Sequence, residues 1–140
     1  DEKYISTIGV KVSRKTVAVP RDDGPFVELT MMLWDLAGSE DFSQMRGSYL
    51  RGSAGAILVC DLTRPATLEA TSNYLADLHR VSPDAMAILV ANKSDSPEQQ
   101  MQLEEIRGLA DSLGIDWFVT SAATGENVEE MFRHLARLLI

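Results

Sequence analysis

Cysteine is almost missing from this chain of 140 residues, which contains only Cys60, inside an apolar run. One cysteine cannot form an intrachain disulfide, so the sequence excludes a small secreted scaffold held by bridges and favours a reducing cytosol. No apolar run approaches the roughly 20 residues needed to span a bilayer. We therefore expect a cytoplasmic protein with no membrane contact from these residues; peripheral attachment through segments outside them stays an open alternative.

Basic residues are also few, because 13 lysines and arginines stand against 21 aspartates and glutamates, a formal net charge of -8. This excess of negative charge repels phosphate backbones over most of a surface and argues against nucleic-acid binding. A local phosphate site remains compatible with it. At 140 residues the chain is long enough for one domain with a buried core and too short for two.

Three short apolar segments show little alternation, which is typical of strands covered on both faces in a parallel sheet. They are Ala54–Cys60, Ala85–Ala91 and Ile115–Val119. Near the start, two further predicted strands are joined by a cluster of turn-forming residues and indicate a β-hairpin. These strands are Gly9–Val19 and Phe26–Trp34, with Pro20-Arg21-Asp22-Asp23-Gly24-Pro25 between them. We expect one mixed sheet with five strands.

Apolar residues with helical spacing follow each of these three apolar segments. The first predicted helix begins at Thr63-Arg64-Pro65, and the second begins near Ser96-Pro97-Glu98-Gln99 and ends at Gly114. A third helix follows Gly125, with Asn127 and Glu130 in capping-box-like spacing. Alternation of strands and helices predicts a doubly wound α/β fold.

Three short motifs follow predicted strands, at the carboxyl edge where open parallel sheets bind ligands. They are Asp35-Leu36-Ala37-Gly38, Asn92-Lys93-Ser94-Asp95 and Thr120-Ser121-Ala122. The first carries no weight alone, since any strand-ending turn explains it, and the second is a moderate signal. Their order, each at the end of a strand, favours a functional site over coincidence.

These residues resemble the Ras superfamily of small GTPases, and Rab proteins in particular, over essentially the whole chain. Four segments, one of which contains the first motif, are similar to Rab switch and loop sequences: Ile5-Ser6-Thr7-Ile8-Gly9, Trp34-Asp35-Leu36-Ala37-Gly38-Ser39-Glu40, Ser48-Tyr49-Leu50-Arg51-Gly52 and Thr124-Gly125-Glu126-Asn127-Val128. The resemblance implies a three-layer P-loop NTPase fold with a mostly parallel sheet and one antiparallel hairpin strand. It also implies a single GTP-binding domain over residues 1–140, binding GTP or GDP with Mg²⁺.

The base-reading residue is expected to be Asp95. Guanine offers a ring N–H and an amine side by side, and a carboxylate is an acceptor-only group that can take both. Adenine lacks this donor pair and would leave the carboxylate unpaired, which disfavours it strongly. By the resemblance, Asn92 braces the loop and contacts the base, the stem of Lys93 covers the base plane, and the Ala122 N–H meets the guanine carbonyl.

The phosphate end is implied by the same resemblance. Thr7 would ligate Mg²⁺, Asp35 would hold it through water, and the N–H groups of Thr7 and Gly38 would face the γ-phosphate. Loss of that phosphate would loosen Asp1–Gly9 and Asp35–Tyr49, which we expect to bind regulatory and effector proteins.

Two residues depart from the family pattern. Ser39 follows Gly38, in the place of the usual water-orienting glutamine, and these two are the catalytic candidates. A serine hydroxyl is too short to hold the same geometry, so we expect slow GTP hydrolysis, or water positioned by another residue, such as one from a partner. Ala123 replaces the usual lysine after Ser121 and Ala122, which removes a charge near the base.

The sequence contains no G-x-x-x-x-G-K-[ST] loop, whose usual place lies before residue 1. In the family the strand before that loop is central to the sheet. We therefore expect an incomplete domain whose natural protein has a preceding strand, loop and helix of roughly 30 residues or more. The alternatives are a pseudo-GTPase or a G-domain interaction module of a larger scaffold, and more distantly an adenylate-using P-loop enzyme.

Overall fold

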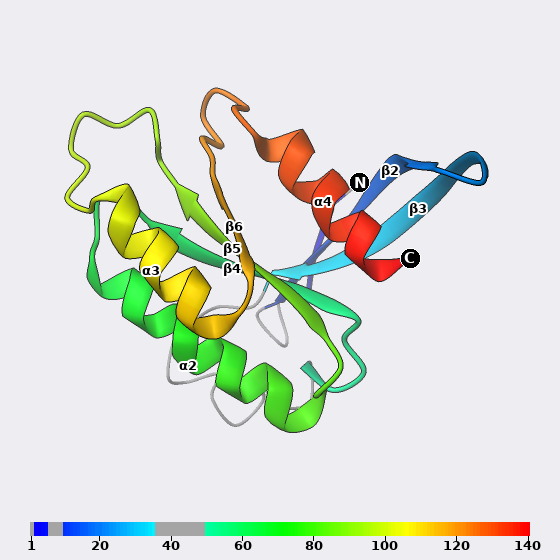
Figure 1. The fold of residues 1–140 in the computed structure, drawn as a ribbon, viewed down its shortest axis with the longest axis horizontal. Coiled ribbons are helices and arrows are strands. Elements are labelled where there is room, and N and C mark those ends of the chain that lie inside the picture. Colours follow the sequence, from blue (N-terminus) through cyan, green and yellow to red (C-terminus); the bar gives the residue numbers. More distant parts are fainter. Residues whose placement is uncertain (1, 6–9, 36–49) are drawn as a thin grey trace. The chain divides into compact units, whose positions relative to one another are not determined.

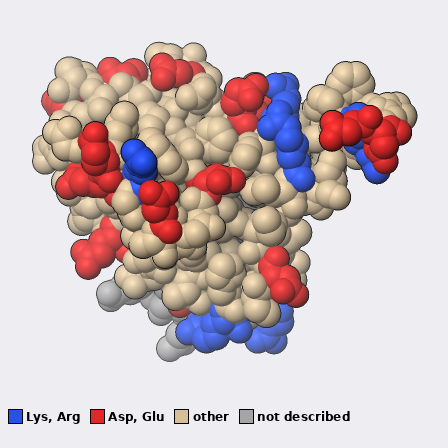
Figure 2. Space-filling view, in the orientation of Figure 1, with Lys and Arg blue, Asp and Glu red and all other residues tan. Residues whose placement is uncertain are grey.

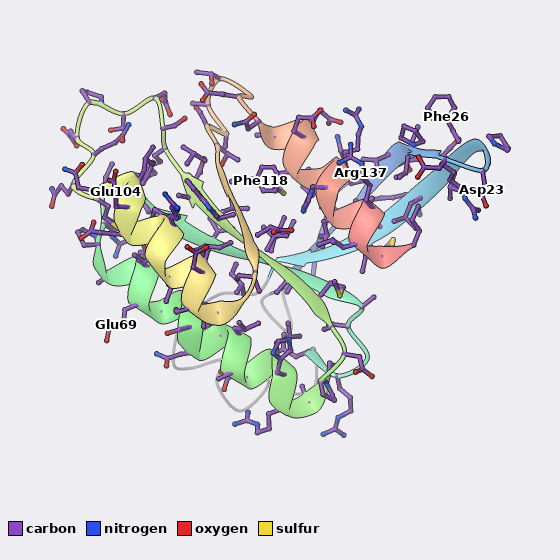
Figure 3. The ribbon with its side chains drawn as sticks, viewed as in Figure 1. Asp23, Phe26, Glu69, Glu104, Phe118 and Arg137 are labelled. Atoms are coloured by element: carbon purple, nitrogen blue, oxygen red, sulfur yellow. The ribbon has the colours of Figure 1, made fainter. Side chains whose placement is uncertain are left out.

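The computed structural model describes residues 2–5, 10–35 and 50–140, which belong to two compact units, Asp1–Tyr49 and Leu50–Ile140. The first unit contains an antiparallel sheet in the order β1-β2-β3 (Figure 1). Its strands are β1 (Glu2–Ile5), β2 (Val10–Arg21) and β3 (Gly24–Asp35). The predicted hairpin is confirmed, with Asp23 and Phe26 at its end (Figure 3).

The second unit alternates strands and helices around a parallel sheet in the order β4-β5-β6. Its strands are β4 (Gly55–Asp61), β5 (Met86–Asn92) and β6 (Asp116–Val119), and its helices are α2 (Ala66–Val81), α3 (Leu103–Leu113) and α4 (Val128–Leu139). The first and last residues of each strand lie within one residue of the predicted bounds. The α/β fold class is confirmed.

Helices cover both faces of this parallel sheet (Figure 1). On one face, α2 and α3 bury a cluster that includes Leu58 and Leu89 of the sheet and Leu78 and Ile106 of the helices. On the other face lies α4, whose Leu135 would contact a side chain added at Gly55. The outer sides of the helices are polar, as Glu69 and Glu104 illustrate in Figure 3. This layering leaves the carboxyl edge of the sheet for a site.

The division into two sheets differs from the single mixed sheet of five strands predicted from the sequence. Within the described ranges there are six strands, because Glu2–Ile5 pairs with β2 although so short a segment has no diagnostic pattern. In the same ranges β3 pairs only with β2, and β4 only with β5. No ladder joins the two sheets in the part of the chain that the structure describes.

The second helix starts later than predicted. Residues 96–101 make other contacts: the Gln100 N–H donates to the Leu62 carbonyl at 2.8 Å, and Met101 is buried in the core. The helix starts once Gln102 can donate its N–H to the Glu105 carboxylate at 3.0 Å. It ends as predicted at Gly114, which has a left-handed φ of 69°.

The capping box predicted for the third helix is wrong. Asn127 is left-handed, with φ 61°, and its side chain makes no cap. Instead its amide donates to the Val119 carbonyl at 2.9 Å, while Glu130 pairs with Arg133 at 2.9 Å. Asparagine tolerates the left-handed region better than most residues, which lets this side chain reach back to β6.

The described residues show the length and polarity of the helices and the distribution of charge on one face. None of the helices in that part of the chain is long and apolar enough to cross a bilayer. On the face shown in Figure 2, acidic side chains are scattered over the surface, and the basic ones form smaller groups. That distribution agrees with the acidic composition of the sequence.

The single cysteine is inaccessible. Cys60 is 1% exposed, and burial, reinforced by the negative charge of Asp61, raises the pKa of its thiol to about 11. The thiolate is the reactive form, and a rise of the thiol pKa from 9.0 to about 11 lowers the thiolate fraction about 100-fold.

We expect Cys60 in native protein at pH 8 to react with an aromatic disulfide reagent at least about 100-fold slower than in urea-unfolded protein. Comparable rates in both would contradict this packing.

Candidate functional site

The carboxyl ends of the three parallel strands lie side by side at one edge of the second unit. In the ladder Asp61 is opposite Asn92, and Ala91 is opposite Val119. Hydrogen bonds continue beyond the strands, because the Ser94 N–H donates to the Thr120 carbonyl at 3.0 Å. The loops that carry the second and third motifs are therefore joined at their bases.

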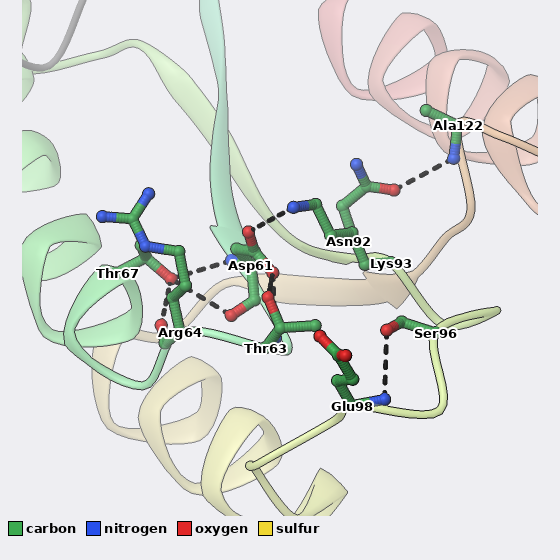
Figure 4. A network of polar contacts seen from close by, with 9 residues as sticks. All are labelled: Asp61, Thr63, Arg64, Thr67, Asn92, Lys93, Ser96, Glu98 and Ala122. Atoms are coloured by element: carbon green, nitrogen blue, oxygen red, sulfur yellow. Dashed lines mark hydrogen bonds and ion pairs between the residues drawn. The ribbon is translucent and has the colours of Figure 1, made fainter.

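Asn92 connects these two loops through its side chain. Its Oδ1 accepts the Ala122 N–H at 3.0 Å and the Thr120 hydroxyl at 3.2 Å (Figure 4 draws the former). Asn92 thus ties the loop after β5 to the loop after β6. The Ala122 N–H, which the resemblance assigns to a guanine carbonyl, donates to Asn92 in this structure.

Asp95 is brought to the same loop by Ser121. The Ser121 hydroxyl donates to Asp95 Oδ1 at 2.8 Å and accepts the Thr124 N–H at 3.1 Å. Ser121 is 0% exposed, whereas Asp95 is exposed. Since a carboxylate has about four acceptor positions, Asp95 is oriented by a buried neighbour and still able to accept further donors.

Lys93 leaves the strand in an unusual backbone conformation. Its φ is 73°, in the left-handed region, which costs a residue with a side chain roughly 1–2 kcal/mol. Its ammonium lies 2.8 Å from Asp61 Oδ2, and its side chain is half exposed (Figure 4). Strained backbone of this kind is concentrated at functional sites.

Asp61 is the member of this site that the sequence analysis missed. Besides Lys93, it accepts the N–H and the hydroxyl of Thr63 at 2.9 and 2.6 Å, both on Oδ1 (Figure 4). Burial alone would raise the pKa of Asp61, but the hydrogen bonds from Lys93 and Thr63 outweigh it and lower that pKa to about 2. Its position directly after the apolar run ending at Cys60 was the available signal.

The structure says less about the residues predicted to bind phosphate and metal. Thr7, Gly38 and Ser39 lie outside the described residues, and Asp35 is the last residue of β3, whose side chain is not described. Ala123, which directly follows the Thr120-Ser121-Ala122 motif, is exposed. No group of three or more histidine, cysteine or acidic side chains that could hold a metal occurs in the ranges described.

Known proteins with similar sequences indicate the family of this chain. The Ras family model matches residues 1–140. The chain is 40% identical over 146 residues to Ras-related protein Rab-4 of Dictyostelium discoideum, covering 100% of this chain and 69% of that protein. It is 39% identical over 136 residues to human Ras-related protein Rab-4B, covering 96% and 62%, respectively.

A third relative is Ras-related protein RABD2a of Arabidopsis thaliana, 38% identical over 133 residues and covering 94% of this chain and 63% of the relative. The chain spans about three fifths to two thirds of the length of the curated relatives it matches. On these matches and the α/β fold, the chain belongs to the Ras family and is Rab-like.

The low pKa of Asp61 has a consequence for stability. A carboxyl whose pKa is about 2 when folded and 3.8 ordinarily stabilises the fold above the ordinary pKa, and this contribution is lost as pH falls through the folded pKa. The Asp61→Asn variant lacks this contribution at every pH. Urea unfolding at pH 7, 4, 3 and 2 should therefore show the variant losing less stability than the wild type between pH 4 and pH 2; parallel losses would contradict the ion pair.

Proposed function

We propose that this chain is the guanine-nucleotide-binding domain of a molecular switch, a small GTPase that binds GTP or GDP with Mg²⁺ and slowly hydrolyses GTP. Regulatory and effector proteins would bind at Asp1–Gly9 and Asp35–Tyr49. The observation that carries the proposal is the Asp95 carboxylate, held at 2.8 Å by the buried Ser121 hydroxyl. Family membership supports the same reading.

The chemistry of this site favours guanine over other bases. Ser121 orients one oxygen of Asp95, so the carboxylate needs no rearrangement to accept two parallel N–H groups. A base lacking that donor pair would leave a desolvated carboxylate unsatisfied, which is the strongest way for a site to reject an analogue. Asn92 supports the same site by accepting the Ala122 N–H, which holds the loop after β6 in place.

The phosphate end of the proposal rests on family membership and on residue types. A hydroxyl at Thr7 and a carboxylate at Asp35 are hard oxygen donors of the kind that Mg²⁺ prefers. Glycine at 38 would let the backbone approach a γ-phosphate closely. Loss of that phosphate would release both switch segments, so partners would distinguish the two nucleotide states.

The nucleotide that remains bound through purification tests the proposal. Full-length protein should release GDP or GTP on denaturation, identified by chromatography and mass spectrometry. Asp95→Asn should lower the affinity for GDP at least about 100-fold, because an amide cannot accept both donors. The control variant Asp84→Asn, at the opposite end of β5, should leave the affinity for GDP unchanged. Release of an adenine nucleotide would refute the base assignment; no nucleotide and no GDP binding would favour an interaction module.

Hydrolysis provides a separate prediction. Serine at 39 cannot reach and orient water as the longer amide side chain would, so single-turnover GTP hydrolysis by wild type should be slow. Ser39→Gln should accelerate it by about tenfold or more, with unchanged GTP affinity. Equal, fast rates for the two proteins, measured by released phosphate, would show that Ser39 does not limit the reaction.

A further inference from the structure

Asp61 uses its two carboxylate oxygens for different partners. Oδ1 accepts both the N–H and the hydroxyl of Thr63 at 2.9 and 2.6 Å, while Oδ2 faces the Lys93 ammonium at 2.8 Å (Figure 4). The ladder places Asp61 directly opposite Asn92, the residue before that lysine. One oxygen is thus anchored to the chain and the other is presented to Lys93.

We propose that Asp61 is a positioning residue, which holds Lys93 in the orientation that contacts the purine ring. The inference rests on the proposed binding of guanine nucleotide and adds a specific residue to it. Asp61 would touch no part of the nucleotide and would act only through the lysine.

The lysine requires such a partner because of how it leaves the strand. Its stem is flexible, and a half-exposed lysine side chain can adopt many positions in water. The left-handed backbone at φ 73° determines where the stem begins, and Asp61 determines where it ends. A stem held at both ends presents its methylene groups as a fixed apolar surface, which suits the face of a planar base.

Asp61 also has a purely structural explanation that must be separated from this one. A carboxylate accepting the N–H two residues later forms a local turn, which Asp61 does with Thr63. Asparagine keeps an oxygen for that turn but carries no charge for the lysine. Asp61→Asn therefore removes the interaction with Lys93 while preserving the turn, and Asp61→Glu retains the charge.

The test is a double-mutant cycle on the full-length protein, with a fluorescent GDP analogue as the probe. Asp61→Asn and Lys93→Ala should each weaken binding about tenfold, the usual scale of one charge-assisted contact. The double variant should be no weaker than Lys93→Ala alone, because Asp61 acts through the lysine. Asp61→Glu should recover most of the affinity, and Asp84→Asn, which removes the same charge elsewhere, should match wild type.

Independent, multiplied losses in the double variant would overturn the inference and leave Asp61 with its turn alone. Wild-type affinity in Asp61→Asn would overturn it as well, while GDP binding itself still supported the proposed function. Failure of wild type to bind the GDP analogue would remove the proposed function and the inference together. Urea unfolding of each variant at pH 7 confirms that the proteins compared are folded.

Discussion

Parallel pairing of β4, β5 and β6 determines which side chains can meet at the carboxyl edge of the second unit. The register sets Asp61 beside Asn92 and brings the chain beyond Val119 next to the loop that follows β5. Several contacts of the site then join residues far apart in sequence, such as Asp95 with Ser121. A shift of one residue in either ladder would turn these side chains to the other face of the sheet.

The polar groups at this edge are organised so that buried atoms hold exposed ones. Ser121 is fully buried and its hydroxyl is used twice, once by Asp95 and once by the Thr124 N–H. Asn92 is half-buried and accepts from two donors on the facing loop. Satisfied polar contacts of this kind favour a single arrangement of the groups that face solvent.

Much of this could be predicted from residue patterns, because the strands are unbroken apolar runs and the loop motifs follow them directly. The Ala85–Ala91 run predicted β5 within one residue at each end. Features set by tertiary contacts could not be predicted: α3 begins late because Gln100 bonds Leu62, and Asn127 reaches Val119 in place of capping its helix. Asp61 resembles any strand-ending acid until the fold brings Lys93 to it.

The link between the loop after β6 and the start of α4 has a thermodynamic corollary. The side chain of Asn127, at the start of that helix, donates a hydrogen bond to the Val119 carbonyl. Ser121, two residues after Val119, donates a hydrogen bond to Asp95. A ligand bound to Asp95 would therefore protect α4 from proteolysis and hydrogen exchange. By reciprocity, anything that frays that helix would weaken the binding of such a ligand.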